Sequence, residues 1–205
     1  MGLNSVSGNS NGQSVSGSLW LDYEKQEWTH KARFQGYNAE FDDKVTANSI
    51  QIDAESFHDI SERSYKFGSG RYQNDKLSGY DYQGAISFGF GRHFLTQENS
   101  DLDFDLSLGY RKSALDDAGG DFNEFIYRVR VLFSNDFSES TSLKSWVLME
   151  EGDNATYVEG EIRLKTAITD ALALVASYKR RRNSNLPSDD STLTGYTSVS
   201  FSYEI

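Results

Sequence analysis

The sequence contains no cysteine and no long apolar run. Without cysteine, the chain has neither a disulfide framework nor thiolate metal sites. No stretch approaches the roughly 20 apolar residues that a transmembrane helix needs, so a helical membrane protein is excluded. Residues 1–4 lack the basic and apolar parts of a secretory signal, and we therefore expect a mature chain from which any signal has been removed.

Positive charge is also scarce. The 20 lysines and arginines oppose 31 acidic residues, which gives a formal net charge of −11. Because neutralising phosphates requires a basic face, we expect no nucleic-acid partner. The three histidines are scattered and have no carboxylates at close spacing, so we predict no metal site, and no motif indicates a cofactor.

Apolar and polar residues alternate with a period of two along almost the whole chain, and no segment shows a helical period. This pattern predicts an all-β protein of about twelve strands, and an even number of strands returns the chain to its starting side. The expected strands are 2–9, 12–24, 28–40, 45–58, 64–74, 80–95, 102–113, 122–135, 142–151, 155–168, 171–182 and 192–205. We find no linker between them and therefore expect a single domain, residues 1–205.

The stretch YDYQGAISFGFGRHF, residues 80–94, shows what the two faces of a strand carry. One face presents Tyr80, Tyr82, Ile86, Phe88, Phe90 and Phe94, and the other presents Asp81, Gln83, Ser87 and His93. Two architectures fit this alternation: a soluble sandwich or barrel with its apolar face inward, and a membrane barrel with its apolar face outward.

The heights of the aromatic residues favour the membrane barrel. If both termini lie on the periplasmic side, aromatic side chains gather at two levels and aliphatic ones lie between them, as at the two interfaces of a bilayer. The expected membrane-interface aromatics are Tyr80, Tyr82, Tyr110, Phe125 and Tyr127 at the outer rim, and Trp28, Phe94, Phe104, Phe133, Phe201 and Tyr203 at the inner rim. Expected strands of about 10 to 14 residues also match a tilted bilayer crossing. We therefore predict a closed antiparallel transmembrane β-barrel.

Charged residues occupy the opposite face of the same strands and are expected to line the lumen. The possible ion path consists of Arg111, Arg128, Arg130, Arg163, Lys165, Lys179, Arg181, Asp103, Asp105, Glu124, Glu159 and Glu161, with Asp22, Lys31, Arg33, Asp53 and Glu55 on earlier strands. One interpretation is a narrow, charge-lined pore for small solutes or ions, which we prefer. The alternative is a non-conducting structural barrel whose opposite charges pair and fill the lumen.

The joints expected on the outer side are rich in acids. They carry Asp42, Asp43, Asp75, Asp116, Asp117, Asp121, Glu150, Glu151, Asp153, Asp189 and Asp190. These acids could bridge divalent cations to an anionic lipid surface. We prefer the simpler interpretation of solvated turns, because Asp is a favoured turn residue.

An enzymatic alternative is an outer-membrane phospholipase-type hydrolase, which requires a serine nucleophile and a histidine on the lipid-facing surface. His93 has no serine two positions along the same face, and His58 runs into a turn. We therefore predict that the protein is not an enzyme and has no catalytic residues.

Several motifs resemble one known family. They are Ser7-Gly8-Asn9-Ser10, Gly79-Tyr80-Asp81-Tyr82, Ile168-Thr169-Asp170-Ala171-Leu172-Ala173-Leu174, Ser177-Tyr178 and Asn183-Ser184-Asn185-Leu186-Pro187. With them, the chain resembles the salt-induced outer-membrane proteins of Gram-negative bacteria, a domain family of unknown function. The resemblance implies a monomeric barrel in the outer membrane, a role in the salt or osmotic response, and contacts with outer-membrane lipids and the barrel-assembly machinery.

Overall fold

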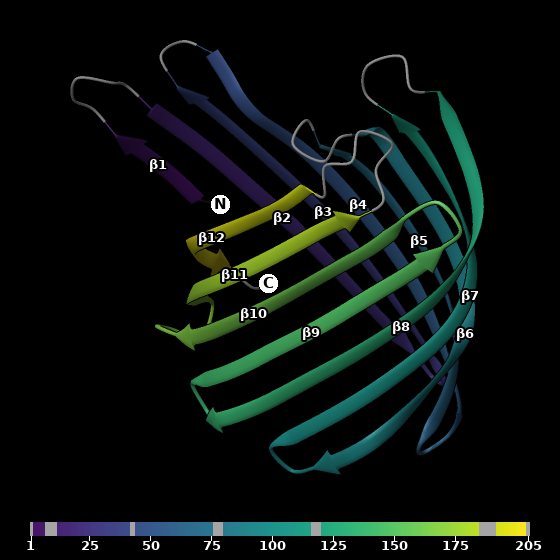
Figure 1. Cartoon of the computed structure of the whole chain (residues 1–205). Helices are drawn as coiled ribbons and strands as arrows, with labels where there is room; N and C mark the ends of the chain where they lie inside the picture. The colour runs from purple at the N-terminus through teal and green to yellow at the C-terminus, as the bar shows by residue number, and fades with distance from the viewer. Residues whose placement is uncertain are drawn as a thin grey trace.

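The computed structural model describes residues 2–6, 12–41, 44–75, 80–115, 120–184 and 192–203. These residues form one antiparallel sheet in which every strand pairs with its neighbours in the chain, in the order β1 to β12 (Figure 1). The strands are β1 (Gly2–Val6), β2 (Gly12–Lys25), β3 (Trp28–Phe41), β4 (Lys44–Ser61), β5 (Ser64–Asp75), β6 (Tyr80–Gln97), β7 (Ser100–Leu115), β8 (Asp121–Ser138), β9 (Thr141–Gly152), β10 (Thr156–Ala167), β11 (Leu172–Ser184) and β12 (Thr192–Tyr203). The described residues contain no helix that is long and apolar enough to span a bilayer.

The all-β, antiparallel prediction is confirmed, and the strand ends differ from the expected ones mainly at one end of the sheet. There the strands continue into two-residue turns, such as Gln26 and Glu27 between β2 and β3. Gln26 adopts a φ of 55°, which closes this tight turn in the left-handed region. We call this end, where β2 leads into β3 and β8 into β9, the turn end.

The sheet curves strongly, so that its two faces have different surroundings (Figure 1). We call the inward-curving side the concave face and the other the convex face. The strand order begins with β1 and ends with β12, and these edge strands approach one another. Within the described ranges no ladder of paired residues joins them. The predicted closure of the barrel, and the number of strands in a closed wall, therefore stay predictions.

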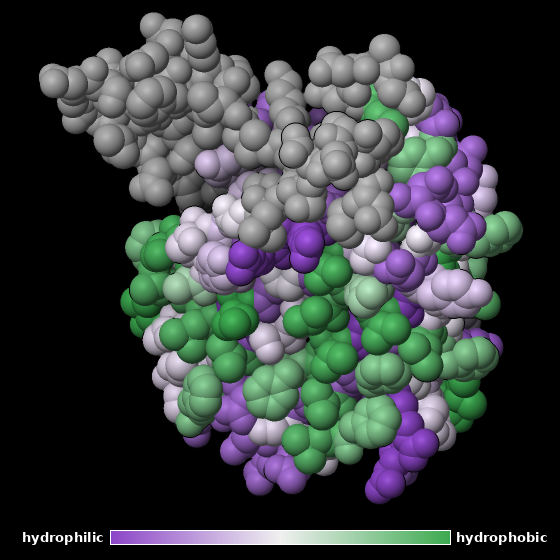
Figure 2. Space-filling view, in the orientation of Figure 1, coloured by the Kyte–Doolittle hydropathy of each residue, from purple (hydrophilic) through white to green (hydrophobic). Residues whose placement is uncertain are grey.

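The convex face is an apolar surface. In the middle of β6, β7 and β8 most outward side chains are apolar and exposed, and Phe88, Leu108 and Phe125 are 70%, 63% and 78% exposed. Figure 2 shows the side of the molecule on which β9, β10 and β11 face the viewer, where hydrophobic residues form a broad band across the middle with hydrophilic residues beyond it. Monomeric soluble proteins rarely expose contiguous apolar patches of more than a few hundred Å². The convex face thus has the character of a lipid-facing surface.

Most of the expected interface aromatics lie on this convex face. Trp28, Phe94, Tyr110, Phe125, Tyr127, Phe201 and Tyr203 are exposed, while Tyr82, Phe104 and Phe133 are partly covered by neighbours. The central part of the face is not purely aliphatic, because Phe88 lies directly across from Leu108 and Phe90 from Leu106.

The placement of Tyr80 on the lipid-facing side is wrong. Tyr80 is only 3% exposed, and its ring centroid lies 6.2 Å from that of Phe122. The β6–β7 ladder shifts register between Tyr80 and Tyr82, which leaves Asp81 as an extra, exposed residue. Because such a bulge reverses the alternation, Tyr80 points to the face opposite to the one that the regular pattern predicts.

Replacing Leu108 by Arg tests whether the convex face contacts lipid. Leu108 lies midway along β7, so the substitution places a charge near the middle of the apolar band. We expect it to lower the free energy of unfolding by about 2 to 4 kcal/mol, measured by urea titration of the protein folded into phospholipid vesicles.

The control is Glu98→Arg, in the exposed turn between β6 and β7. A charge outside the apolar band should leave the free energy of unfolding nearly unchanged. Equal losses for both variants, or a wild-type protein that stays monodisperse without detergent, would contradict a lipid-facing surface.

Candidate functional site: the charged concave face

Charged side chains fill the concave face. Arg111 is fully buried and Glu159 is 1% exposed, at alternating positions of strands whose opposite face is apolar. Within one wall of the sheet, Arg111 Nη2 lies 2.6 Å from Glu124 Oε1, and Arg130 Nη2 lies 2.7 Å from Asp105 Oδ2. Opposite charges on adjacent strands thus neutralise one another, as cross-strand pairs do.

A second set of ion pairs joins strands that are far apart in the sheet. Arg71 of β5 lies 2.6 Å from Glu150 of β9, measured from Nη2 to Oε2. The Nη1 atom of Arg130 on β8 lies 2.5 Å from Oε1 of Glu55 on β4. These contacts bridge the concave space, so the curvature of the sheet brings β4 and β5 opposite β8 and β9.

The same bridging continues at β11. Arg181 Nη1 lies 2.7 Å from Asp75 Oδ2 on β5, and Arg181 Nε lies 2.8 Å from Glu159 Oε2 on the neighbouring strand β10. Lys179 Nζ donates to Gln51 Oε1 on β4 at 2.9 Å. Each buried cation therefore has an anionic or polar partner, which offsets the cost of taking it out of water.

Aromatic hydroxyl groups complete the network. The Tyr65 hydroxyl donates to Asp105 Oδ1 at 2.5 Å, and the Tyr157 hydroxyl donates to Glu159 Oε2 at 2.6 Å. The guanidinium of Arg71 lies 3.8 Å from the centroid of the Tyr157 ring. These rings occupy space that water would fill in an open channel, so the middle of the concave face is packed as well as paired.

Two glycines make room for this packing. A Cβ at Gly91 would overlap the Tyr65 ring and come 2.5 Å from Asp105 Oδ1. At Gly152 a Cβ would overlap the carboxylate of Glu124. Neither position tolerates a side chain without displacing a member of the ion-pair network.

The structure brings together most of the charges that the sequence assigned to the ion path. Nine of them are buried on the concave face: Asp105, Arg111, Glu124, Arg128, Arg130, Glu159, Glu161, Lys179 and Arg181. Asp103, Arg163 and Lys165 are only partly buried and lie towards the turn end. Asp103 Oδ1 lies 2.6 Å from His93 Nδ1 and takes no part in the central pairs.

Sequence reasoning missed several members of the network. Asp75 and Glu150 were expected in solvated outer joints, and this is wrong, because both are buried and paired inside the concave face. Each ends a run of alternate inward positions, Arg71 to Asp75 on β5 and Trp146 to Glu150 on β9. The alternation along each strand could therefore have predicted that both acids point inward. We assigned them to turns instead, because Asp and Glu are common near turns.

The other expected joint acids do not form a described site. Asp121, Glu151 and Asp153 are exposed. Asp42, Asp43, Asp116, Asp117, Asp189 and Asp190 lie outside the described residues. The interpretation as cation bridges therefore stays untested.

One histidine lies opposite a serine on the convex face, the side on which a phospholipase-type hydrolase would need both residues. His30 faces Ser56 directly across the β3–β4 ladder on the convex face. Beside them, a groove of about 770 Å³ is lined mainly by apolar side chains, among them Trp28, Phe88 and Phe90, together with His58 and a few polar residues. No hydrogen bond joins Ser56 to His30 or His58 in the described structure, so the serine lacks the partner that would activate it.

The comparisons with known proteins agree with this architecture. A family model described as "Protein of unknown function, DUF481" matches residues 1–205. The chain belongs to this family. No curated protein matches the sequence.

Among solved structures, the chain is similar in fold to the NanC porin. The TM-score is 0.60 at 7% sequence identity, and the match covers 100% of this chain and 98% of the porin. The translocator domain of the autotransporter NalP from Neisseria meningitidis gives a TM-score of 0.49 at 13% identity, over 100% of this chain and 85% of that domain. The first of these matches shows that the DUF481 chain is similar in fold to a porin.

The substitution Glu150→Gln tests how strongly the buried pairs hold the fold. It leaves Arg71 without its closest anionic partner, and breaking a buried ion pair in this way costs about 3 to 5 kcal/mol. We expect a loss of this size in the free energy of unfolding, measured by urea titration in lipid vesicles.

Asp121→Asn is the matched control, because Asp121 and Lys112 are a solvent-exposed pair at the strand ends opposite the turn end, 3.4 Å apart. Its loss should have no measurable effect. A Glu150→Gln variant as stable as this control would show that the network is not what stabilises the sheet.

Gly91→Ala tests the packing of the same network. The added methyl group must push the Tyr65 ring off Asp105, so we expect a clear fall in the midpoint of thermal unfolding in detergent micelles. Gly70→Ala is the control, because a Cβ at Gly70 meets no atom within 4 Å. Equal midpoints for the two variants would mean that the space around Tyr65 is not restricted.

Proposed function

We propose that this DUF481 protein is an integral outer-membrane β-barrel whose interior is closed by its own ion pairs, and that it is a structural, non-conducting component of the membrane. Its apolar convex face and its porin-like fold support the membrane location. The packed concave face supports the closed interior. Of the two interpretations that the sequence left open, the geometry favours the filled lumen over the open pore.

The observation that carries this proposal is the set of ion pairs between opposite strands. Charges that line an aqueous path remain exposed to the water in it. Here Arg71, Arg130 and Arg181 reach across the concave space to carboxylates on distant strands and are nearly excluded from solvent. A solute on this path would have to break buried pairs, which opposes passage.

Closure of the wall between β1 and β12 is part of the same proposal. An unpaired strand edge in hydrocarbon would leave backbone N–H and C=O groups without partners, at several kcal/mol for each group. The two edges already approach one another. Pairing them completes a barrel of about twelve strands, a size between the side-chain-filled eight-stranded barrels and the wide porins.

The pore is the second candidate, because the solved structure with the similar fold is a porin. In that case the ion-pair network would be a constriction rather than a permanent plug. With either candidate function, we propose that the protein is a monomer, that it acts in the salt or osmotic response, and that the barrel-assembly machinery inserts it. We propose no enzymatic activity for the protein.

Single-channel recording in a planar lipid bilayer distinguishes the two candidates. We expect the wild-type protein to give no steady conductance steps, because the central charges are paired and covered. The double variant Glu55→Ala, Arg130→Ala removes both members of one bridging pair, and the carboxylate of Asp105, which also pairs with Arg130, keeps the hydrogen bond from Tyr65. It should open a path and produce conductance steps.

The variant Lys112→Ala, which changes an exposed residue outside the network, should remain silent like the wild type. Regular steps from the wild-type protein that change in size with Arg128→Ala or Arg163→Ala would contradict the plugged barrel and favour the pore.

A further inference from the structure

Two tryptophans and two arginines meet on the concave face towards the turn end. The guanidinium of Arg163 on β10 lies 4.2 Å from the ring centroid of Trp20 on β2. Arg33 lies 5.2 Å from the Trp20 ring and 5.6 Å from the ring of Trp146 on β9. Trp20 is nevertheless 43% exposed, although it faces inward. An open aromatic surface beside cations is thus available within the concave face.

The charge beside this aromatic surface is not balanced in the way that the central network is. Arg163 lies directly across from Lys144 in the β9–β10 ladder, and like charges at such positions destabilise a sheet. Arg163 pairs with Glu161 at 2.7 Å. Lys144 is exposed and makes no ion pair or hydrogen bond with any described residue. One cation of the pair is therefore free to bind an anion.

Glu161 cannot easily serve Lys144 as well. Its carboxylate already accepts from Arg163, lies 3.9 Å from Arg33 and accepts from the Trp146 ring nitrogen at 3.3 Å. Another nearby carboxylate, Asp53, pairs with Arg33 at 2.8 Å. Glu161 and Asp53 are thus engaged, and neither neutralises Lys144.

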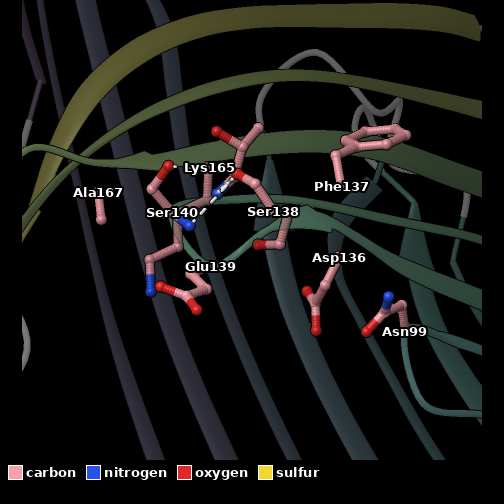
Figure 3. A pocket seen from close by; sticks show the side chains of 10 residues that line it. Asn99, Asp136, Phe137, Ser138, Glu139, Ser140, Lys165 and Ala167 are labelled. Carbon is pink, nitrogen blue, oxygen red and sulfur yellow. Dashed lines mark hydrogen bonds between the residues drawn. The ribbon is translucent and has the colours of Figure 1, made fainter.

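A pocket opens next to this cluster at the turn end. It has a volume of about 480 Å³ and is lined by Ser142, Lys165, Asp136, Glu139 and residues of the β8–β9 turn (Figure 3). Arg163 and Lys165 are successive inward residues of β10, and Lys144 and Ser142 are their partners across the ladder on β9. The turn is closed by Ser138 Oγ, which accepts from the backbone N–H groups of Ser140 and Thr141 at 3.3 and 3.1 Å. Lys144 and Arg163 are therefore the next inward residues beyond the pocket on these two strands.

We propose that this cluster binds a small solute that carries a carboxylate and a ring with an apolar face. The carboxylate contacts Lys144 and Arg163, and the ring stacks on the exposed part of Trp20. Charge-assisted hydrogen bonds and stacking on an aromatic ring are the two interactions that these side chains offer. The site lies outside the central network, so binding does not require conduction through the barrel.

Tryptophan fluorescence in detergent micelles tests the proposal directly. Trp28 lies on the convex face, so the Trp28→Phe protein restricts the signal to Trp20 and Trp146. The probes are benzoate, an aromatic carboxylate, and glucuronate, a sugar acid. Benzyl alcohol and glucose are their uncharged counterparts. We expect a saturable change in fluorescence with at least one acid and none with its neutral counterpart.

The decisive variant is Lys144→Gln in the Trp28→Phe background. Because Lys144 is exposed and unpaired, its loss should leave the fold intact, which the far-ultraviolet circular dichroism spectrum checks. It should raise the apparent Kd about tenfold, as expected when one hydrogen bond to a charged group is lost. Lys112→Gln, which changes another exposed lysine, on β7, should leave the Kd unchanged.

A saturable response to benzoate alone would assign the ring contact to aromatic compounds, and a response to glucuronate would extend the class to sugar acids. Linear quenching without saturation, an equal response to the neutral counterparts, or the same Kd after Lys144→Gln would overturn the proposal. Saturation by Ca²⁺ in place of the acids would assign the pocket to Asp136 and Glu139 and likewise overturn it. These outcomes are independent of the conductance of the barrel, because no bilayer is involved.

Discussion

A charged side chain buried in a protein interior must find a partner, because an isolated ion there costs several kcal/mol. On the concave face of this sheet, partners on adjacent strands are not sufficient. Arg71, Arg130 and Arg181 are each paired with an acid on a strand that is distant in the sheet. These pairs form only if the sheet curves far enough to bring the two walls together. The curvature, the filled interior and the burial of the charges therefore depend on one another.

The apolar convex face is the complement of this arrangement. Alternation sends one set of side chains inward to the ion pairs and the other set outward, onto the exposed convex face. In water such a surface would be a liability, whereas in a bilayer it is the stable one. Each face of such a sheet needs surroundings that match its polarity. The inner charges need partners of opposite charge, and the outer apolar groups need lipid.

The concave face does not have one character throughout. In its middle, aromatic hydroxyls and glycine-lined space hold the carboxylates tightly, as around Tyr65, Asp105 and Gly91. Towards the turn end, Trp20 and Lys144 are exposed although they face inward. The first region suits a plug and the second suits a binding site. The proposed plug and the proposed binding site therefore occupy different parts of the same face.

The sequence alone determined the fold class and the strand pattern, because alternation is a local property of each strand. It also identified most of the charges that meet on the concave face, including Arg111, Glu124 and Glu159. It could not decide between a pore and a plug, since this depends on which charges meet across the space. The partners of Arg71 and Arg181 lie on strands far away in the chain, and no local pattern specifies such pairs. Tyr80 shows the same limit, because a single bulge in the β6–β7 ladder reversed its direction. Alternation assigns a side chain to a face, and only the register and curvature of the whole sheet decide what it meets there.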